Sequence, residues 1–256
     1  MTAEPRGWRE WALLAVVLVP LALILTRPPI PQDLTFHAFA DDRAWWGIPS
    51  FQNVASNLPF LLIGVAGLRL CAGRIAGGAT RSWVVFFLGV ALAFFGSVWY
   101  HWNPNNETLV WDRLPIVIAF MALFSALVGE HLGAGVERAV LAPALAVGIA
   151  SLAWWAYADD LRVYVWCQAA PLLAIVFVLI AYPGKHTHRA YLAYALAAYL
   201  LAKVAEFQDR EIYALTSHAM SGHALKHLLA ALGIFFIYLM LRRRKQIAAE
   251  VPAAAT

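Results

Sequence analysis

The sequence predicts an all-α fold in which about eight helices form a polytopic transmembrane bundle. Of its 256 residues, 62% are hydrophobic and 13% are charged, with a mean hydropathy of +0.67. Soluble domains are ordinarily about half apolar and about 25% charged. Eight apolar stretches also approach the roughly 20 residues that a helix needs to cross a bilayer. They occupy more than half of the chain, which excludes a separate soluble domain.

The eight expected spans follow one another with short connections. They cover residues 8–26, 52–71, 82–101, 109–129, 139–157, 163–182, 191–207 and 220–241. The first span follows Arg6 and Arg9, as a signal peptide would, but it is long for one and no small-residue cleavage site comes after it. We therefore expect one integral membrane domain over 1–256, with a tail over 242–256.

The distribution of Lys and Arg predicts the orientation of the bundle. An even number of spans places both termini on one side of the membrane. Twelve Lys and Arg residues flank the spans on that side and five on the other. Because cytoplasmic loops retain positive charge, both termini are expected in the cytoplasm. The net charge of +4 follows from this asymmetry, so nucleic-acid binding is not expected.

Five polar side chains are expected in one leaflet although they come from three spans. Ser97 and His101 lie at the outer end of the third span, and Asp112 opens the fourth. His223 and His227 occupy the first two turns of the last span, which also begins outside. Because polar groups inside a membrane are costly, each is a candidate for function.

The spacing of these residues predicts a metal site. His223 and His227 are four residues apart and so project from one face of a helix. A third imidazole from His101 would complete a three-ligand site with a fourth position for water, which is typical of catalytic zinc. Zinc lowers the pKa of bound water to about 7, so Asp112 is the expected proton acceptor and donor. Ser97 is expected to hydrogen-bond a polarised carbonyl.

Other interpretations exist for each of these signals taken alone. A pair of histidines four residues apart can ligate haem or form a packed polar pair, and serine in a membrane helix often bonds its own backbone. Convergence from three helices favours the metal site. The remaining histidines are expected elsewhere: His131, His186 and His188 in solvated cytoplasmic loops, and His37 and His218 on the outer surface.

Three further groups of residues have structural interpretations. Buried charges in the last two spans are expected to form an ion triad: Lys203, Glu206 and Lys226. Polar residues opening the second span are expected to form interhelical hydrogen bonds near the site: Asn53, Ser56 and Asn57. Five tryptophans are expected to form an aromatic belt at the outer interface: Trp45, Trp46, Trp99, Trp102 and Trp111.

Four short motifs resemble the alkaline ceramidase family, in the wider group of seven-helix membrane hydrolases that includes progestin/adiponectin-type receptors. They are Asn-Val-Ala-Ser-Asn-Leu at 53–58, Gly-Ser-Val-Trp-Tyr-His at 96–101, Asp-Arg-Leu-Pro at 112–115 and Gly-His-Ala-Leu-Lys-His at 222–227. The resemblance covers 51–241. It implies that His101, His223 and His227 hold zinc, that Asp112 handles the proton and that Ser97 assists at the carbonyl.

The sequence also departs from that family. Arg113 stands where the eukaryotic enzymes have glutamate, and Lys226 where an aromatic residue is common, so substrate selection is expected to differ. Asp41 and Asp42 are misplaced for the family's calcium-binding segment, and Ser50 replaces an expected glutamate, so calcium is not expected. The span over 8–26 lies outside the resemblance and is an additional helix.

These observations predict a zinc-dependent intramembrane amidohydrolase. It would cleave the amide of a ceramide-like lipid to a fatty acid and a sphingoid base, in a bacterial inner membrane and with its site towards the outer leaflet. The alternatives are a non-enzymatic bundle that binds haem or metal for electron transfer, and a receptor-like lipid-binding protein. The sequence gives no indication of oligomeric state.

Overall fold

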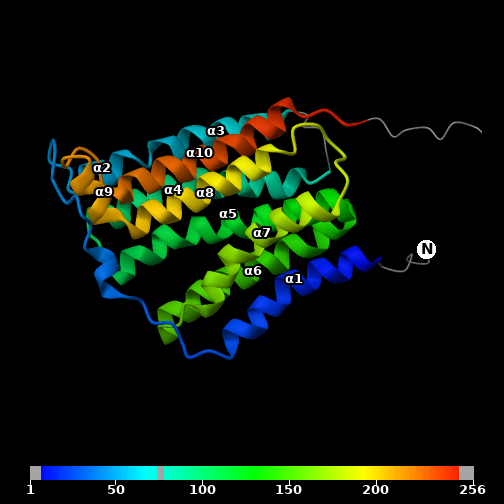
Figure 1. Ribbon diagram of the computed structural model, residues 1–256, viewed down its shortest axis with the longest axis horizontal. Helices are drawn as coiled ribbons and strands as arrows, with labels where there is room; N and C mark the ends of the chain where they lie inside the picture. The colour runs from blue at the N-terminus through cyan, green and yellow to red at the C-terminus, as the bar shows by residue number, and fades with distance from the viewer. Residues whose placement is uncertain (1–6, 74–77, 248–256) are drawn as a thin grey trace, which may run out of the picture.

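A computed structural model describes residues 7–73 and 78–247, and it confirms the all-α fold (Figure 1). No strand occurs in these two ranges. The expected tail is described only as far as Ile247, and residues 248–256, like Arg6 and Arg74, lie outside the described residues.

The helices follow the order of the predicted spans. The long helices are α1 (Trp8–Leu25), α3 (Leu58–Ala72), α4 (Thr80–Trp102), α5 (Asn106–Leu132), α6 (Ala134–Ala158), α7 (Arg162–Ala181), α8 (Tyr191–Phe207) and α10 (Gly222–Arg243). The short elements are a 3-10 turn (Leu34–His37), α2 (Phe51–Ala55) and α9 (Asp209–Leu215).

Seven segments in the described part of the chain are long and apolar enough to cross a membrane, with α2 and α3 together forming one of them. The remaining predicted span is α8, which has only 17 residues. It nevertheless runs beside α10 along the bundle (Figure 1). Trp8 and Arg243 lie at the same end of the bundle, opposite to α2 and α9. The first and last long helices of the described chain therefore begin and end at the same end of the bundle, away from α2 and α9.

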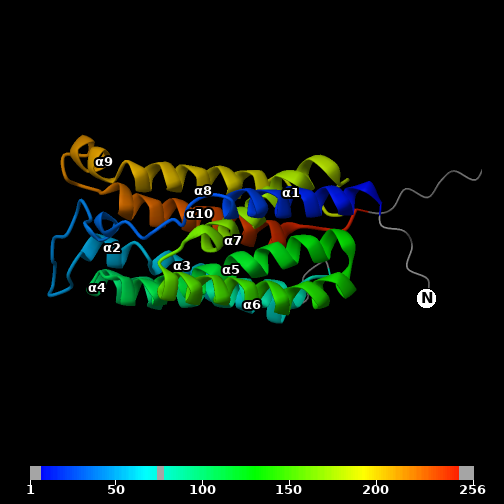
Figure 2. The ribbon, with the colours of Figure 1, turned by 90° about the horizontal axis from the view of Figure 1, so that it is seen from below.

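Helix α5 is the centre of the bundle. It is the most buried of the candidate spans, because α4, α6 and α7 all pack against it. Figure 2 shows α8 and α1 on one face of the bundle and α4 and α6 on the other. Helix α1 is the least buried candidate span and packs on α7, where the Trp166 indole donates to the Val17 carbonyl (2.8 Å).

The predicted second span is not one continuous helix, which corrects the sequence-based expectation. Pro59 has no N–H to donate to the carbonyl four residues earlier, so α2 ends at Ala55 and α3 begins at Leu58. Side chains replace the missing backbone bonds at the break. Ser56 Oγ and Asn57 Nδ2 both donate to the Asn53 carbonyl (3.1 and 2.6 Å).

The chain between α1 and α2 folds back over the α2/α9 end of the bundle (Figure 1). It is fastened at the corner between α6 and α7, where Ile30 N donates to Asp160 Oδ1 (3.3 Å) and Gln32 N to Asp159 Oδ1 (2.9 Å). Hydrogen bonds from Arg162 hold the pKa of Asp160 well below its usual range, so this anchor stays charged at neutral pH.

Close helix packing at glycines supports the bundle, and Gly64 provides a test of it. A Cβ added at Gly64 of α3 would lie 2.6 Å from the Ala91 amide nitrogen of α4, so Gly64→Ala must push two backbones apart. We expect a lower Tm, equivalent to about 1–3 kcal/mol of lost stability.

The control is Gly135→Ala on α6, where an added Cβ meets nothing within 4 Å. Helix propensity should make that variant neutral or slightly more stable. Thermal melting of both purified variants measures the difference, and equal Tm values would contradict the packing argument.

Candidate metal centre

Three buried histidines meet at the α2/α9 end of the bundle. His101 comes from the last turn of α4, and His223 and His227 from the first two turns of α10. One potential ligand atom of each lies within 4.8 Å of those of the other two. Their side chains are almost fully buried, with exposures of 1%, 4% and 5%. The predicted convergence of these three residues is confirmed.

The first turn of α10 is held in place by its neighbours. Asp209 Oδ1 accepts from the His223 amide (2.7 Å), and Ser221 Oγ accepts from the Ala224 amide (3.0 Å) as an N-cap. Gly222 allows a very close helix crossing, since a Cβ there would lie 2.2 Å from the Ala205 carbonyl oxygen. These contacts determine the position of the His223 backbone, and so of its side chain.

A second glycine brings Ser97 and Asp112 to one cavity. A Cβ at Gly96 of α4 would lie 2.1 Å from the Trp111 carbonyl oxygen of α5. The backbones therefore approach most closely beside the two predicted polar residues. Ser97 and Asp112 both line the cavity that His227 also lines, while Asp112 is not one of the three clustered groups. Asp112 thus shares this cavity with His227 without belonging to the histidine cluster.

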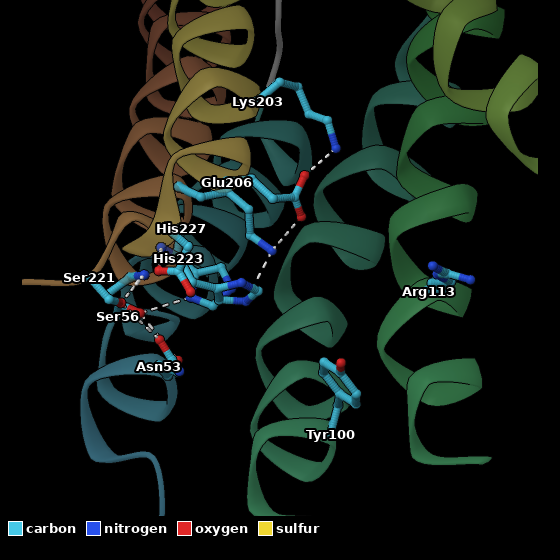
Figure 3. A network of polar contacts seen from close by, with 12 residues as sticks. Asn53, Ser56, Tyr100, Arg113, Lys203, Glu206, Ser221, His223 and His227 are labelled. Carbon is cyan, nitrogen blue, oxygen red and sulfur yellow. Dashed lines mark hydrogen bonds and ion pairs between the residues drawn. The ribbon is translucent and has the colours of Figure 1, made fainter. Parts of the chain in front are cut away.

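Hydrogen bonds orient His227 (Figure 3). Ser56 Oγ lies 2.8 Å from His227 Nδ1 and donates its only hydrogen to the Asn53 carbonyl. With that hydrogen on the Asn53 carbonyl, Ser56 accepts from Nδ1–H, which leaves the Nε2 lone pair of His227 free for a metal ion. Asn57 Nδ2, at 3.4 Å from Nδ1, is then a packing contact rather than a donor to this ring. This assignment of the proton follows from the hydrogen-bond network. The prediction that Asn53, Ser56 and Asn57 make interhelical contacts here is confirmed.

The donor set fits a cation such as zinc. Three imidazoles without a thiolate are suitable zinc ligands. His101 Nδ1 is buried and has no hydrogen-bond partner in the described part of the chain, as expected of a ligand atom awaiting an ion. His223 Nε2 instead receives a hydrogen bond from Lys226 Nζ (3.1 Å). A metal at that nitrogen would have to displace the ammonium group.

The expected ion triad is present beside the histidines. Glu206 of α8 pairs with Lys226 of α10 (3.0 Å) and with Lys203 of its own helix. Figure 3 shows the contact between Lys203 and Glu206 as a dashed line. The carboxylate offsets the charge of Lys226 next to the histidine cluster.

An aromatic layer that the sequence did not reveal covers the cluster. Phe39 packs on the rings of His101 and His223, with centroid separations of 4.7 and 4.6 Å. The expected surface position of His37 holds only in part, because its side chain is half-buried. Its two ring nitrogens contact Tyr100 Oη and Asn106 Oδ1, both at 2.9 Å, because the folded-back segment carries it onto α4 and α5.

The other histidines lie away from the cluster. His218 is exposed, as expected. His131, His186 and His188 lie at the opposite end of the bundle, but His131 is not in a solvated loop. It ends α5, contacts the Leu127 carbonyl (2.9 Å) and packs against Tyr182.

The belt tryptophans and Asp41 differ in their exposure. The five belt tryptophans are exposed, as predicted. Asp41, which is misplaced for a calcium site, is buried and accepts two hydrogen bonds from the Arg43 guanidinium. Burial raises the pKa of Asp41, but the bonds from Arg43 outweigh it and hold this pKa below its usual range.

A cavity of about 320 Å³ extends from the polar residues into the bundle, in the size range of small-molecule sites. Its walls away from the histidines are apolar and include Phe86, Leu123 and Ile237. Ser97 and Phe86 are eleven residues apart on α4, which corresponds to about 16 Å along the helix. The cavity is therefore long, with a polar end and an apolar body.

No family model matches the chain, and no curated protein matches it. The chemistry of this centre is therefore indicated by its own residues alone.

The contact between Ser56 and His227 predicts a measurable effect on metal affinity. We expect Ser56→Ala to weaken zinc binding about 10- to 100-fold, because His227 loses the group that sets its proton and orientation. Competition with a chelator of known affinity measures this. Ser151→Ala, which removes a buried hydroxyl of α6 that donates to the Gly148 carbonyl, is the matched control. Unchanged affinity in Ser56→Ala would rule out this role.

Proposed function

We propose that the protein is a zinc-dependent intramembrane amidohydrolase that cleaves N-acyl lipids. The observation that carries this proposal is the buried cluster of His101, His223 and His227 next to a cavity lined by Asp112 and Ser97. A histidine cluster that can hold a metal ion, a carboxyl group and a hydroxyl group along one apolar cavity are components that amide hydrolysis can use.

Zinc held by the three imidazoles would supply an activated water and polarise a carbonyl. Asp112 takes a proton from the attacking water and returns it to the leaving nitrogen. The water oxygen bonds to the carbonyl carbon, the C–N bond breaks, and a carboxylic acid and an amine result. Ser97 donates a hydrogen bond to the carbonyl oxygen as charge develops there.

The shape and lining of the cavity support an acyl chain as one part of the substrate. Its apolar walls lie along α4, α5 and α10, towards the middle of helices long enough to cross a membrane. An acyl chain placed there positions an amide beside Asp112. A ceramide-like lipid, which would yield a fatty acid and a sphingoid base, is one substrate of this class.

We further propose a bacterial inner membrane with both termini in the cytoplasm and the histidines towards the outer leaflet. Positive charge supports this orientation. Exposed Arg242, Arg243 and Lys245 lie at the end of the bundle away from the histidines, as the positive-inside rule requires.

Replacement of the proposed proton carrier tests the function. We expect Asp112→Ala to lower the rate of fatty-acid release about 10²- to 10⁴-fold while metal content is retained. His223→Ala should lose both activity and metal. Mass spectrometry of acids released from a panel of N-acyl lipids, ceramides included, measures turnover with and without a chelator.

Exposed His218 provides the control, since His218→Ala should retain activity and metal. Full turnover in Asp112→Ala would refute the assignment. A Soret band in the purified protein would instead favour haem binding and electron transfer, and zinc with lipid binding but no released acid would favour a receptor-like role.

A further inference from the structure

The cavity has a second polar feature, Arg113, on the residue after Asp112. The two side chains leave α5 about 100° apart, since an α-helix has 3.6 residues per turn. Arg113 lines the cavity and is only 7% exposed. Figure 3 shows it set apart from the histidines.

Aromatic rings and one amide hold the guanidinium. Its central carbon lies 4.3 Å from the centroid of Trp155 and 5.0 Å from that of Tyr164. Nη2 donates to Gln32 Oε1 (2.6 Å), on the segment that folds back from α1. The aromatic rings thus contact the face of the Arg113 guanidinium and Gln32 binds one of its nitrogens, so that its orientation is fixed.

The rest of the guanidinium is unsatisfied. Nη1 is buried and has no hydrogen-bond partner in the described ranges, and no ion pair within them includes Arg113. A buried cationic donor without a partner is costly. A ligand that brings an anionic acceptor would remove this cost.

The charges around the cavity also favour an anion. Three cationic side chains line it (Arg113, Lys203 and Lys226) against two carboxyl groups (Asp112 and Glu206). Glu206 is already paired with both lysines. With Asp112 ionised, and before any metal ion is counted, the lining carries one positive charge in excess, and a bound ligand with one negative charge would balance it.

We propose that Arg113 binds a carboxylate on the amine side of the substrate, so that the preferred substrates are N-acyl amino acids rather than neutral ceramides. This inference rests on the proposed amidohydrolase function and specifies its substrate class. One free guanidinium nitrogen and one excess charge match a carboxylate better than a phosphate monoester, which carries about −1.5 to −2 at neutral pH. With Gln32 and Trp155 holding Arg113, Asp112 stays free to carry protons.

Binding of non-cleavable ligands tests the site independently of turnover. Suitable probes are ketone analogues of N-oleoylglycine and N-oleoylethanolamine, in which CH2 replaces the amide NH. We expect the full-length, metal-loaded protein in nanodiscs to bind the carboxylate analogue about tenfold or more tightly than the alcohol analogue. The analogue of N-oleoyl-γ-aminobutyrate, two methylenes longer, tests the spacing.

Arg113→Met should bring the ratio of the two affinities close to one, because the side chain keeps an unbranched apolar stem and loses its charge and its hydrogen-bond donors. Arg113→Lys, which keeps the charge but not the planar fork, should retain part of the preference, and it serves as the test if Arg113→Met does not fold. Arg242→Met removes an exposed arginine at the other end of the bundle and should leave the ratio unchanged.

Equal affinities for the charged and neutral analogues in the unmodified protein, or an unchanged ratio in Arg113→Met, would overturn the proposal. Tighter binding of an N-oleoylaminoethyl phosphate analogue would replace carboxylate by phosphate as the ligand. The two proposals fail separately. If neutral amides are cleaved but the carboxylate analogue is not preferred, the amidohydrolase proposal is supported and the anion-site proposal is refuted. If an Arg113-dependent preference for the carboxylate analogue is found without cleavage, only the anion-site proposal is supported.

Discussion

Two glycines determine how closely the helices approach around the candidate site. Gly96 lets α4 reach the backbone of α5 beside Asp112, and Gly222 lets α10 reach the carbonyl of Ala205 at the end of α8. Between lipid-facing helices there is little hydrophobic gain, so van der Waals packing at small residues supplies much of the attraction. The polar groups of the site are next to these crossings, and their positions follow from helix packing rather than from loop conformation.

Much of this arrangement was predictable because helices have a fixed period. The four-residue spacing of His223 and His227 places them on one face, and alternation of the spans places His101 at the same end. The cost of buried charge predicted the pairing of Lys203, Glu206 and Lys226. Each of these inferences needs only helix geometry and the rule that polar groups inside a membrane find partners.

The contacts made by the segment between α1 and α2 were not predictable. Phe39 on the imidazoles and His37 on Tyr100 depend on where an irregular chain lies, and an irregular chain has no period to show it. The break at Ser56 arises from Pro59, which lies inside the apolar stretch over 52–71 that reads as continuous. The surroundings of Arg113 combine residues from three distant parts of the chain, which a local pattern cannot reveal.

The segment between α1 and α2 also affects how a lipid would reach the cavity. Gln32 is held at Asp159, and Asn53, just beyond the segment, donates to the Asp41 carbonyl, so the covering layer is fastened at both ends. Phe39 lies directly over the imidazoles beneath it. For a lipid of the class proposed, diffusion within the bilayer then replaces diffusion through water. Occupancy of the cavity would be governed by the mole fraction of that lipid in the surrounding leaflet, and its aqueous solubility would matter little.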